Sequence, residues 1–175
     1  MGSHRTATAT SRGFTLIELL VVLMIMGLVV GLAAAIVRPD DRGLLRVEAE
    51  RLAQLLDLAA AESRLTGTPI AWTAEGPGYG FWRMTADGDW SEVRDSDLLR
   101  ARTLPQGMTI TGLQVENAPV RGVIRLQFAP YYGAAQSFTI TMSLGDARYA
   151  VVASPIGDVQ VVAGDGASNV KLVRQ

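Results

Sequence analysis

One carboxylate stands inside an otherwise apolar stretch of this chain. Between Phe14 and Val37, only Thr15 and Glu18 are polar. A charged side chain deep in a lipid bilayer costs about 2.5–3.5 kcal/mol on insertion scales, so such a carboxylate calls for a partner or a function. Glu18 is therefore the first candidate functional residue.

The remaining sequence lacks most of the side chains from which catalytic and metal sites are built. It contains no cysteine, and its single histidine, His4, lies before the apolar stretch. This excludes a disulfide framework and a thiolate nucleophile, and it leaves no imidazole downstream for a Ser-His pair or a metal site. No carboxylate pair can be assigned acid and base roles. We therefore predict no catalytic residue, no metal, no cofactor and no enzymatic activity.

The apolar stretch is long enough to form a membrane-spanning helix. At about 1.5 Å per residue, positions 14–37 extend over roughly 36 Å, compared with a hydrocarbon layer of ~30 Å. Arg5 and Arg12 precede the stretch, and residues 1–13 contain no acidic residue. The positive-inside rule then predicts a cytoplasmic N-terminus, with the bulk of the chain on the other side of the membrane.

Two other interpretations of this N-terminus remain open. A removable secretory signal would use Ala33-Ala34-Ala35 as its cleavage site. The length of the stretch and the presence of Glu18 count against it. A plain signal-anchor carrying a periplasmic binding module is the second interpretation, and it leaves Glu18 without an explanation.

Beyond the stretch, the sequence predicts a break over 38–43, because Pro39 lacks an amide donor and disfavours helical geometry at the preceding residue. An amphipathic helix follows and is stopped at Gly67, so that the second helical segment covers 38–66. Its predicted apolar face has 4-3-4-3-4 spacing, widened by Leu55. The residues of this face are Leu45, Ala49, Leu52, Leu56, Ala59 and Ser63.

Residues 67–175 are predicted to be β-rich, because short apolar runs alternate with Gly, Asp and Pro turns. The predicted strands are Ile70–Ala74, Tyr79–Thr85, Thr109–Glu116, Val123–Phe128, Phe138–Leu144, Tyr149–Ser154 and Val159–Val162. We expect residues 91–107 to form a long loop, and Trp72 and Trp82 to belong to the core. The predicted fold class is α+β: a long N-terminal helix packed on an antiparallel β domain of two small sheets or a sandwich.

The segment Gly13-Phe14-Thr15-Leu16-Ile17-Glu18 resembles the class III signal of type IV pilins and pseudopilins. By that resemblance, residues 1–13 are a leader that a prepilin peptidase cleaves after Gly13, and Phe14 becomes the N-methylated first residue. Glu18 would be the assembly glutamate. Its carboxylate can neutralise the Phe14 amine of the next subunit, so that two costly charges are satisfied together.

The C-terminal half resembles the domain shared by the H-class minor pseudopilins of type II secretion and the T- and U-type minor type IV pilins. The similarity rests on Phe128-Ala129-Pro130, Gly133 and the run 154–159 (Ser-Pro-Ile-Gly-Asp-Val). The DNA-uptake pilins carry an arginine-bearing motif after the turn glycine, whereas Asp158 and Gln160 follow Gly157 here. Residues 14–175 also carry 14 basic and 17 acidic residues, net −3, which argues against a nucleic-acid surface.

The resemblance implies a minor pseudopilin anchored in the bacterial inner membrane, with its C-terminal domain in the periplasm and, after assembly, in a short fibre that supports export of folded proteins. The implied partners are the major pseudopilin, the other minor pseudopilins of the tip, the prepilin peptidase and the inner membrane, with secreted proteins as a further class. A minor type IV pilin that serves pilus assembly or DNA uptake is the alternative function.

Overall fold

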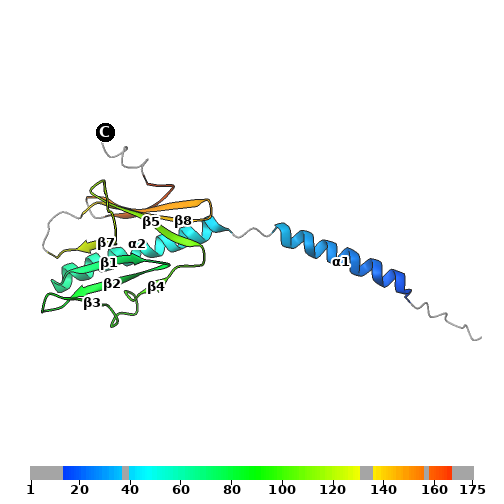
Figure 1. Ribbon diagram of the computed structural model, residues 1–175, viewed down its shortest axis with the longest axis horizontal. Coiled ribbons are helices and arrows are strands. Elements are labelled where there is room, and N and C mark those ends of the chain that lie inside the picture. Colours follow the sequence, from blue (N-terminus) through cyan, green and yellow to red (C-terminus); the bar gives the residue numbers. More distant parts are fainter. Residues whose placement is uncertain (1–13, 37–39, 131–135, 156–157, 167–175) are drawn as a thin grey trace, which may run out of the picture. The chain divides into compact units, whose positions relative to one another are not determined.

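The computed structural model describes residues 14–36, 40–130, 136–155 and 158–166 (Figure 1). The chain divides into two compact units, residues 1–39 and 40–175.

The first unit contains the helix α1, Leu16–Ile36. From Phe14 to Leu32 every side chain is exposed within the unit, and nearly all of these side chains are apolar. No helix within the described residues has the combination of length and hydropathy that crossing a membrane requires. The predicted span includes Val37, which lies outside the described residues, and it stays a prediction.

The second unit begins with α2, Asp41–Thr66. Asp40 caps the helix, because its side chain accepts a hydrogen bond of 3.0 Å from the Gly43 amide. Gly67 ends the helix in the left-handed conformation (φ 69°), the role predicted for it. Pro39 lies outside the described residues, and helical structure resumes at Asp41, before the end of the predicted break. The predicted apolar face is confirmed, since all seven of its residues are buried and Ala53 joins them.

Ten strands follow in the described residues. They are β1 Ile70–Glu75, β2 Gly78–Met84, β3 Trp90–Glu92, β4 Arg102–Thr103, β5 Met108–Val115, β6 Ala118–Pro119, β7 Ile124–Phe128, β8 Phe138–Leu144, β9 Ala147–Ala153 and β10 Val159–Ala163. All seven predicted strands are present, with ends within two residues of those predicted. The short strands β3, β4 and β6 were not predicted.

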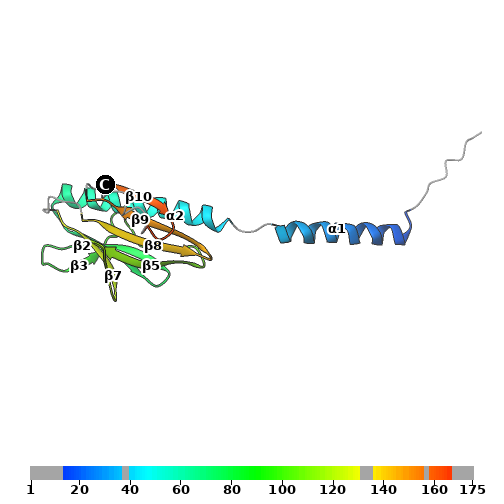
Figure 2. The same cartoon turned by 90° about the horizontal axis from the view of Figure 1, so that it is seen from above.

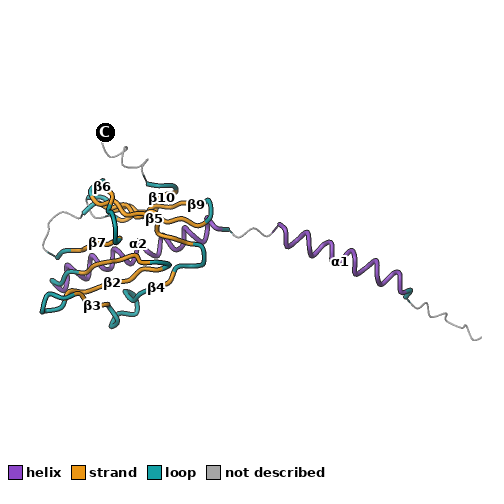
Figure 3. Tube along the Cα trace, in the orientation of Figure 1, coloured by secondary structure: helices purple, strands orange, loops and turns teal. Residues whose placement is uncertain are grey.

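The strands form two antiparallel sheets. Sheet A has the order β3-β2-β1-β7, with β4 also paired to β2, and sheet B has the order β10-β9-β8-β5-β6. The helix α2 contacts β8, β9 and β10 of sheet B, and β1 and β7 of sheet A. Figures 2 and 3 show this helix running along the strands of the second unit. The predicted α+β class with two small sheets is confirmed.

A single hydrophobic core joins α2 to both sheets. Leu52 and Leu56 come from α2, Trp72 and Phe81 from sheet A, and Ile140 from sheet B, and all five are fully buried. Within the described residues, the buried side chains of this core come from residues 45–153. The prediction that Trp72 belongs to the core is confirmed.

Two predictions about this unit were wrong. Trp82 is half-buried and is not part of the core, because it lies on the face of β2 opposite to Tyr79 and Phe81. Residues 91–107 are more than a loop: they include β4 and the last two residues of β3. Their buried side chains, Val93, Leu99 and Leu104, hold the segment against the core.

A buried and an exposed leucine of α2 allow a matched test of the core. Replacing the fully buried Leu56 with alanine is expected to lower the free energy of unfolding by about 2–5 kcal/mol, because it removes apolar contacts and leaves a cavity. Leu65→Ala is the control, because Leu65 lies in the same helix and is 87% exposed; its effect should stay within about 0.5 kcal/mol. Urea denaturation of residues 40–175 measures both values. Similar values for the two variants would contradict the packing described here.

Candidate processing and assembly site

The start of α1 places the predicted site residues at the beginning of an exposed apolar helix. Phe14 precedes the first helical residue by two positions, and its side chain is 77% exposed. Gly13, the other predicted residue of the cleavage site, lies outside the described residues. Because the helix begins only at Leu16, the backbone of Phe14 is not part of it.

Thr15 caps α1 through both of its oxygens. The Glu18 amide donates to the Thr15 carbonyl at 3.1 Å and to Thr15 Oγ1 at 3.4 Å, and the Leu19 amide also donates to the Thr15 carbonyl at 3.2 Å. Thr15-Leu16-Ile17-Glu18 has the spacing of a capping box, in which the threonine hydroxyl accepts from the third helical amide. The Thr-x-x-Glu spacing is the signal in the sequence that could have indicated this cap.

Glu18 therefore stands in the first turn of α1, where the helix dipole favours a negative charge. Its side chain is exposed, and no ion pair of Glu18 occurs in the described part of the chain. Around it, Leu16 and Ile17 are exposed as well. The carboxylate of Glu18 therefore stands among exposed apolar side chains, where a charged group is costly once that surface is buried.

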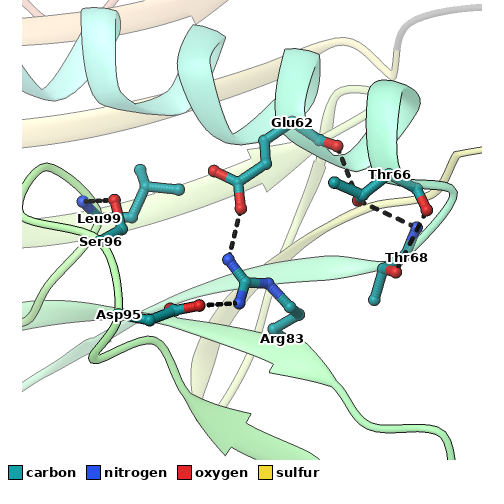
Figure 4. Close-up of polar contacts among 7 residues, drawn as sticks. All are labelled: Glu62, Thr66, Thr68, Arg83, Asp95, Ser96 and Leu99. Carbon is teal, nitrogen blue, oxygen red and sulfur yellow. Dashed lines mark hydrogen bonds and ion pairs between the residues drawn. The ribbon is translucent and has the colours of Figure 1, made fainter.

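A second polar cluster lies in the other unit and connects three elements. The Arg83 guanidinium, on β2, donates through Nη1 to Asp95 Oδ2 at 2.7 Å and through Nη2 to Glu62 Oε1 on α2 (Figure 4). Beside Asp95, the Leu99 amide donates to Ser96 Oγ at 3.2 Å. The hydrogen bond from Arg83 lowers the pKa of Asp95.

This cluster fits a structural role. It joins α2, β2 and the segment after β3, and it contains no nucleophile beside a base. Among the described residues, no group of three or more His, Asp or Glu side chains is placed to hold a metal ion.

Comparison with known protein families identifies both halves of the chain. The prokaryotic N-terminal methylation motif matches residues 9–34, and the type II transport protein GspH matches residues 48–157. The chain belongs to the GspH family. Its members are minor pseudopilins of the type II secretion system, so the predicted resemblance to type IV pilin-like proteins of the H class is confirmed.

Two solved structures share the fold of this GspH-family chain. Both are of the minor pseudopilin EpsH from the type II secretion system of Vibrio cholerae. One is 21% identical with a TM-score of 0.53, covering 68% of this chain and 96% of EpsH. The other is 17% identical with a TM-score of 0.58, covering 70% of this chain and 97% of EpsH. No match was found among curated proteins.

The N-terminal family match covers the whole predicted processing motif. Gly13, Phe14 and Glu18 all lie within the matched range 9–34. Gly133, Ile156 and Gly157, on which the C-terminal resemblance partly rested, lie outside the described residues. Asp158 and Gln160 are both exposed, so the surface after β9 presents an acid and an amide.

The Arg83 cluster makes a prediction about pH. Because the pKa of Asp95 is lower in the folded state than its ordinary value of 3.8, the ionised carboxylate stabilises the fold above that value, and the stabilisation is lost as pH falls through the folded pKa. Asp95→Asn should therefore be less stable than wild type at pH 7, and the difference should shrink as pH falls below about 4. Thermal unfolding across this range measures it. A difference that does not vary with pH would exclude the ion pair as its cause.

Proposed function

We propose that this minor pseudopilin is a structural subunit of the periplasmic fibre that supports export of folded proteins across the outer membrane. The observation that carries the proposal is the presence, in one chain, of an N-terminal methylation motif over residues 9–34 and a GspH match over residues 48–157. The subunit catalyses nothing; its chemistry is that of a substrate for processing.

In this proposal the prepilin peptidase cleaves after Gly13, and the new N-terminal residue, Phe14, is methylated. The exposed, non-helical Phe14 supports this, because a peptidase binds its substrate more readily where the backbone is not held in a helix. Residues 1–13 are the leader that is removed.

Residues 14–37 then anchor the subunit in the inner membrane, with the N-terminus in the cytoplasm. The exposed apolar surface of α1 supports this, since no part of the described first unit covers it. The amphipathic segment 38–66 and the β-rich domain 67–175 lie in the periplasm. After assembly the same apolar surface packs against other helices in the fibre.

In this proposal, Glu18 forms an ion pair with a neighbouring subunit when the fibre assembles. Cleavage creates an amine with a reference pKa of about 7.7–8, which is mainly protonated at neutral pH. A protonated amine and a carboxylate are each costly in apolar surroundings, and the cost falls when the two meet. In the proposal, the Glu18 carboxylate accepts hydrogen bonds from the N-terminal amine of the neighbouring subunit. The neighbours are the major pseudopilin and the other minor pseudopilins at the tip, and secreted proteins are a further class of partner.

The processing proposal predicts the mass of the mature chain. Mass spectrometry of the protein isolated from membranes should show a chain that begins at N-methylated Phe14. Gly13→Leu should leave the leader attached, because the peptidase would no longer accommodate the residue before the cleaved bond. Wild-type protein with an intact leader, or cut after Ala35, would refute the processing proposal.

The assembly proposal predicts a dependence on charge at position 18. Glu18→Gln keeps the capping-box spacing and removes the charge, whereas Glu18→Ala removes both. In a strain lacking the wild-type chain, both variants should be processed, but each should enter the fibre at least about tenfold less well. Breaking one side of a buried ion pair costs about 3–5 kcal/mol, and 1.4 kcal/mol corresponds to a factor of ten.

In the same strains, secretion of a folded enzyme into the medium should decrease as less of the variant chain enters the fibre. Normal incorporation of Glu18→Gln together with poor incorporation of Glu18→Ala would assign Glu18 to helix capping alone. Normal incorporation of both variants would show that Glu18 is not needed for assembly. Normal secretion without the chain would refute the export role.

A further inference from the structure

The outer face of sheet A carries a cluster of large side chains that the core does not use. Thr73 of β1, Trp82 and Met84 of β2, Trp90 of β3 and Arg125 of β7 are all half-buried. Their strand partners place them opposite to Trp72, Phe81 and Leu126, which face the core. We call these five residues the tryptophan face.

Two contacts show that these side chains meet across the sheet. Trp82 Nε1 donates to Thr73 Oγ1 at 2.9 Å, so the Trp82 indole has its hydrogen bond. The Arg125 guanidinium lies over the Trp90 ring, with Cζ 4.3 Å from the ring centroid, in a cation–π arrangement. Beneath the cluster, Ala71 is fully buried although it lies on the face opposite to the core.

Arg125 is incompletely satisfied. Its Nε and Nη2 are closed off from solvent and have no hydrogen-bond acceptor in the described chain. The ion pairs of the described residues engage Arg46, Arg51, Arg83, Arg94 and Arg148, but not Arg125. Buried guanidinium donors without acceptors destabilise a fold. The unpaired donors of Arg125 would no longer carry this cost if a partner molecule supplied the acceptor.

The geometry indicates what that acceptor is. Nε and Nη2 lie on one edge of the guanidinium plane, and this edge binds a carboxylate through two parallel hydrogen bonds. Because both atoms are closed off from solvent, binding of such a carboxylate requires the half-buried Trp90 ring, which lies against the guanidinium, to move aside. Glu92 lies on the same face and forms an ion pair with Arg94. Because this acidic residue would repel a highly charged polyphosphate, a single carboxylate fits the surface better. Tryptophan and arginine are also among the residue types most enriched in the energetic hot spots of protein–protein interfaces.

We propose that the tryptophan face is a docking surface for a neighbouring subunit of the fibre. The neighbour presents an Asp or Glu carboxylate to Arg125 and apolar side chains to Trp82 and Trp90. This inference rests on the proposed function as a fibre subunit. It adds a contact between globular domains to the helix contacts made through Glu18.

The absence of cysteine allows a clean test in the full-length chain. Gln127→Cys places a unique thiol on the same face, since Gln127 is exposed and pairs with Ala71 across β1. Gln160→Cys is the matched control, because Gln160 is also exposed but lies on sheet B. Each thiol carries a benzophenone photo-cross-linker, and the cross-linked partner in fibres is identified by mass spectrometry.

Gln127→Cys should cross-link to another pseudopilin near an acidic residue, and this product should exceed that from Gln160→Cys. Arg125→Gln should reduce it at least tenfold, and Arg125→Lys should restore only part of it because lysine cannot bind in bidentate fashion. Arg148→Gln, which changes an exposed arginine of sheet B, should not affect it. Arg125→Gln should change the melting temperature little, because it removes the cation–π contact with Trp90 together with two unpaired buried donors.

Incorporation into the fibre is measured in the same samples, so the two proposals can fail separately. If the chain enters the fibre and the Gln127→Cys product is absent, joins a second copy of this chain, or is unchanged by Arg125→Gln, the docking proposal is overturned. A melting temperature lowered in proportion to the lost product would assign Arg125 a structural role instead. If the processed chain does not enter the fibre at all, both proposals fall.

Discussion

The structure depends on a division between apolar surface that the chain buries by itself and apolar surface that it leaves for other molecules to cover. In the second unit, α2 and the two sheets enclose a core that includes Trp72, Phe81 and Ile140. In the first unit, α1 exposes apolar side chains from Phe14 to Leu32. Burying an apolar side chain contributes about 1.5–3 kcal/mol, so this exposed surface is a large driving force for insertion or assembly. In the proposed assembly, Glu18 gives that association a direction, because its carboxylate meets the N-terminal amine of the neighbouring subunit.

The two units therefore have separate physical tasks. The second unit is held by its own core and by polar contacts such as the 2.9 Å hydrogen bond from Ser63 Oγ on α2 to the Phe128 carbonyl on β7. Burial even raises the pKa of Tyr79 to about 12, so this side chain stays neutral at every physiological pH. The first unit carries the residues proposed for processing and assembly. In the proposed function, this unit exchanges lipid for other helices while the second unit keeps its own core.

The sequence predicted the features that depend on local periodicity. The α2 face from Leu45 to Ser63 and the strand Phe138–Leu144 both follow regular spacings, and both agree with the structure. The short strands β3, β4 and β6 were missed because two or three residues show no period. Trp82 was misplaced because hydrophobicity alone does not distinguish the two faces of a strand; its alternation with Tyr79 and Phe81 would have shown that it faces away from the core.

The candidate site was predictable to a different extent. Thr15 and Glu18 are close in sequence, so their capping contact could have been recognised from the Thr-x-x-Glu spacing. The contact between Arg125 and Trp90 joins residues 35 positions apart, on strands that are not neighbours in sheet A, so it depends on the tertiary fold and no local pattern indicates it.

The central claim is that Glu18 contacts the N-terminal amine of a neighbouring subunit. Dicyclohexylcarbodiimide enters apolar surroundings and couples a carboxylate to an amine in contact with it, and mass spectrometry of digested fibres can locate the new bond. Lys171 is the only lysine in this sequence, so the chain itself offers few other amines to which Glu18 could be coupled. The account predicts an amide that joins Glu18 to the N-terminus of a neighbouring subunit and is absent with Glu18→Gln. A Glu18 side chain that carries the reagent but is never joined to an amine would contradict it.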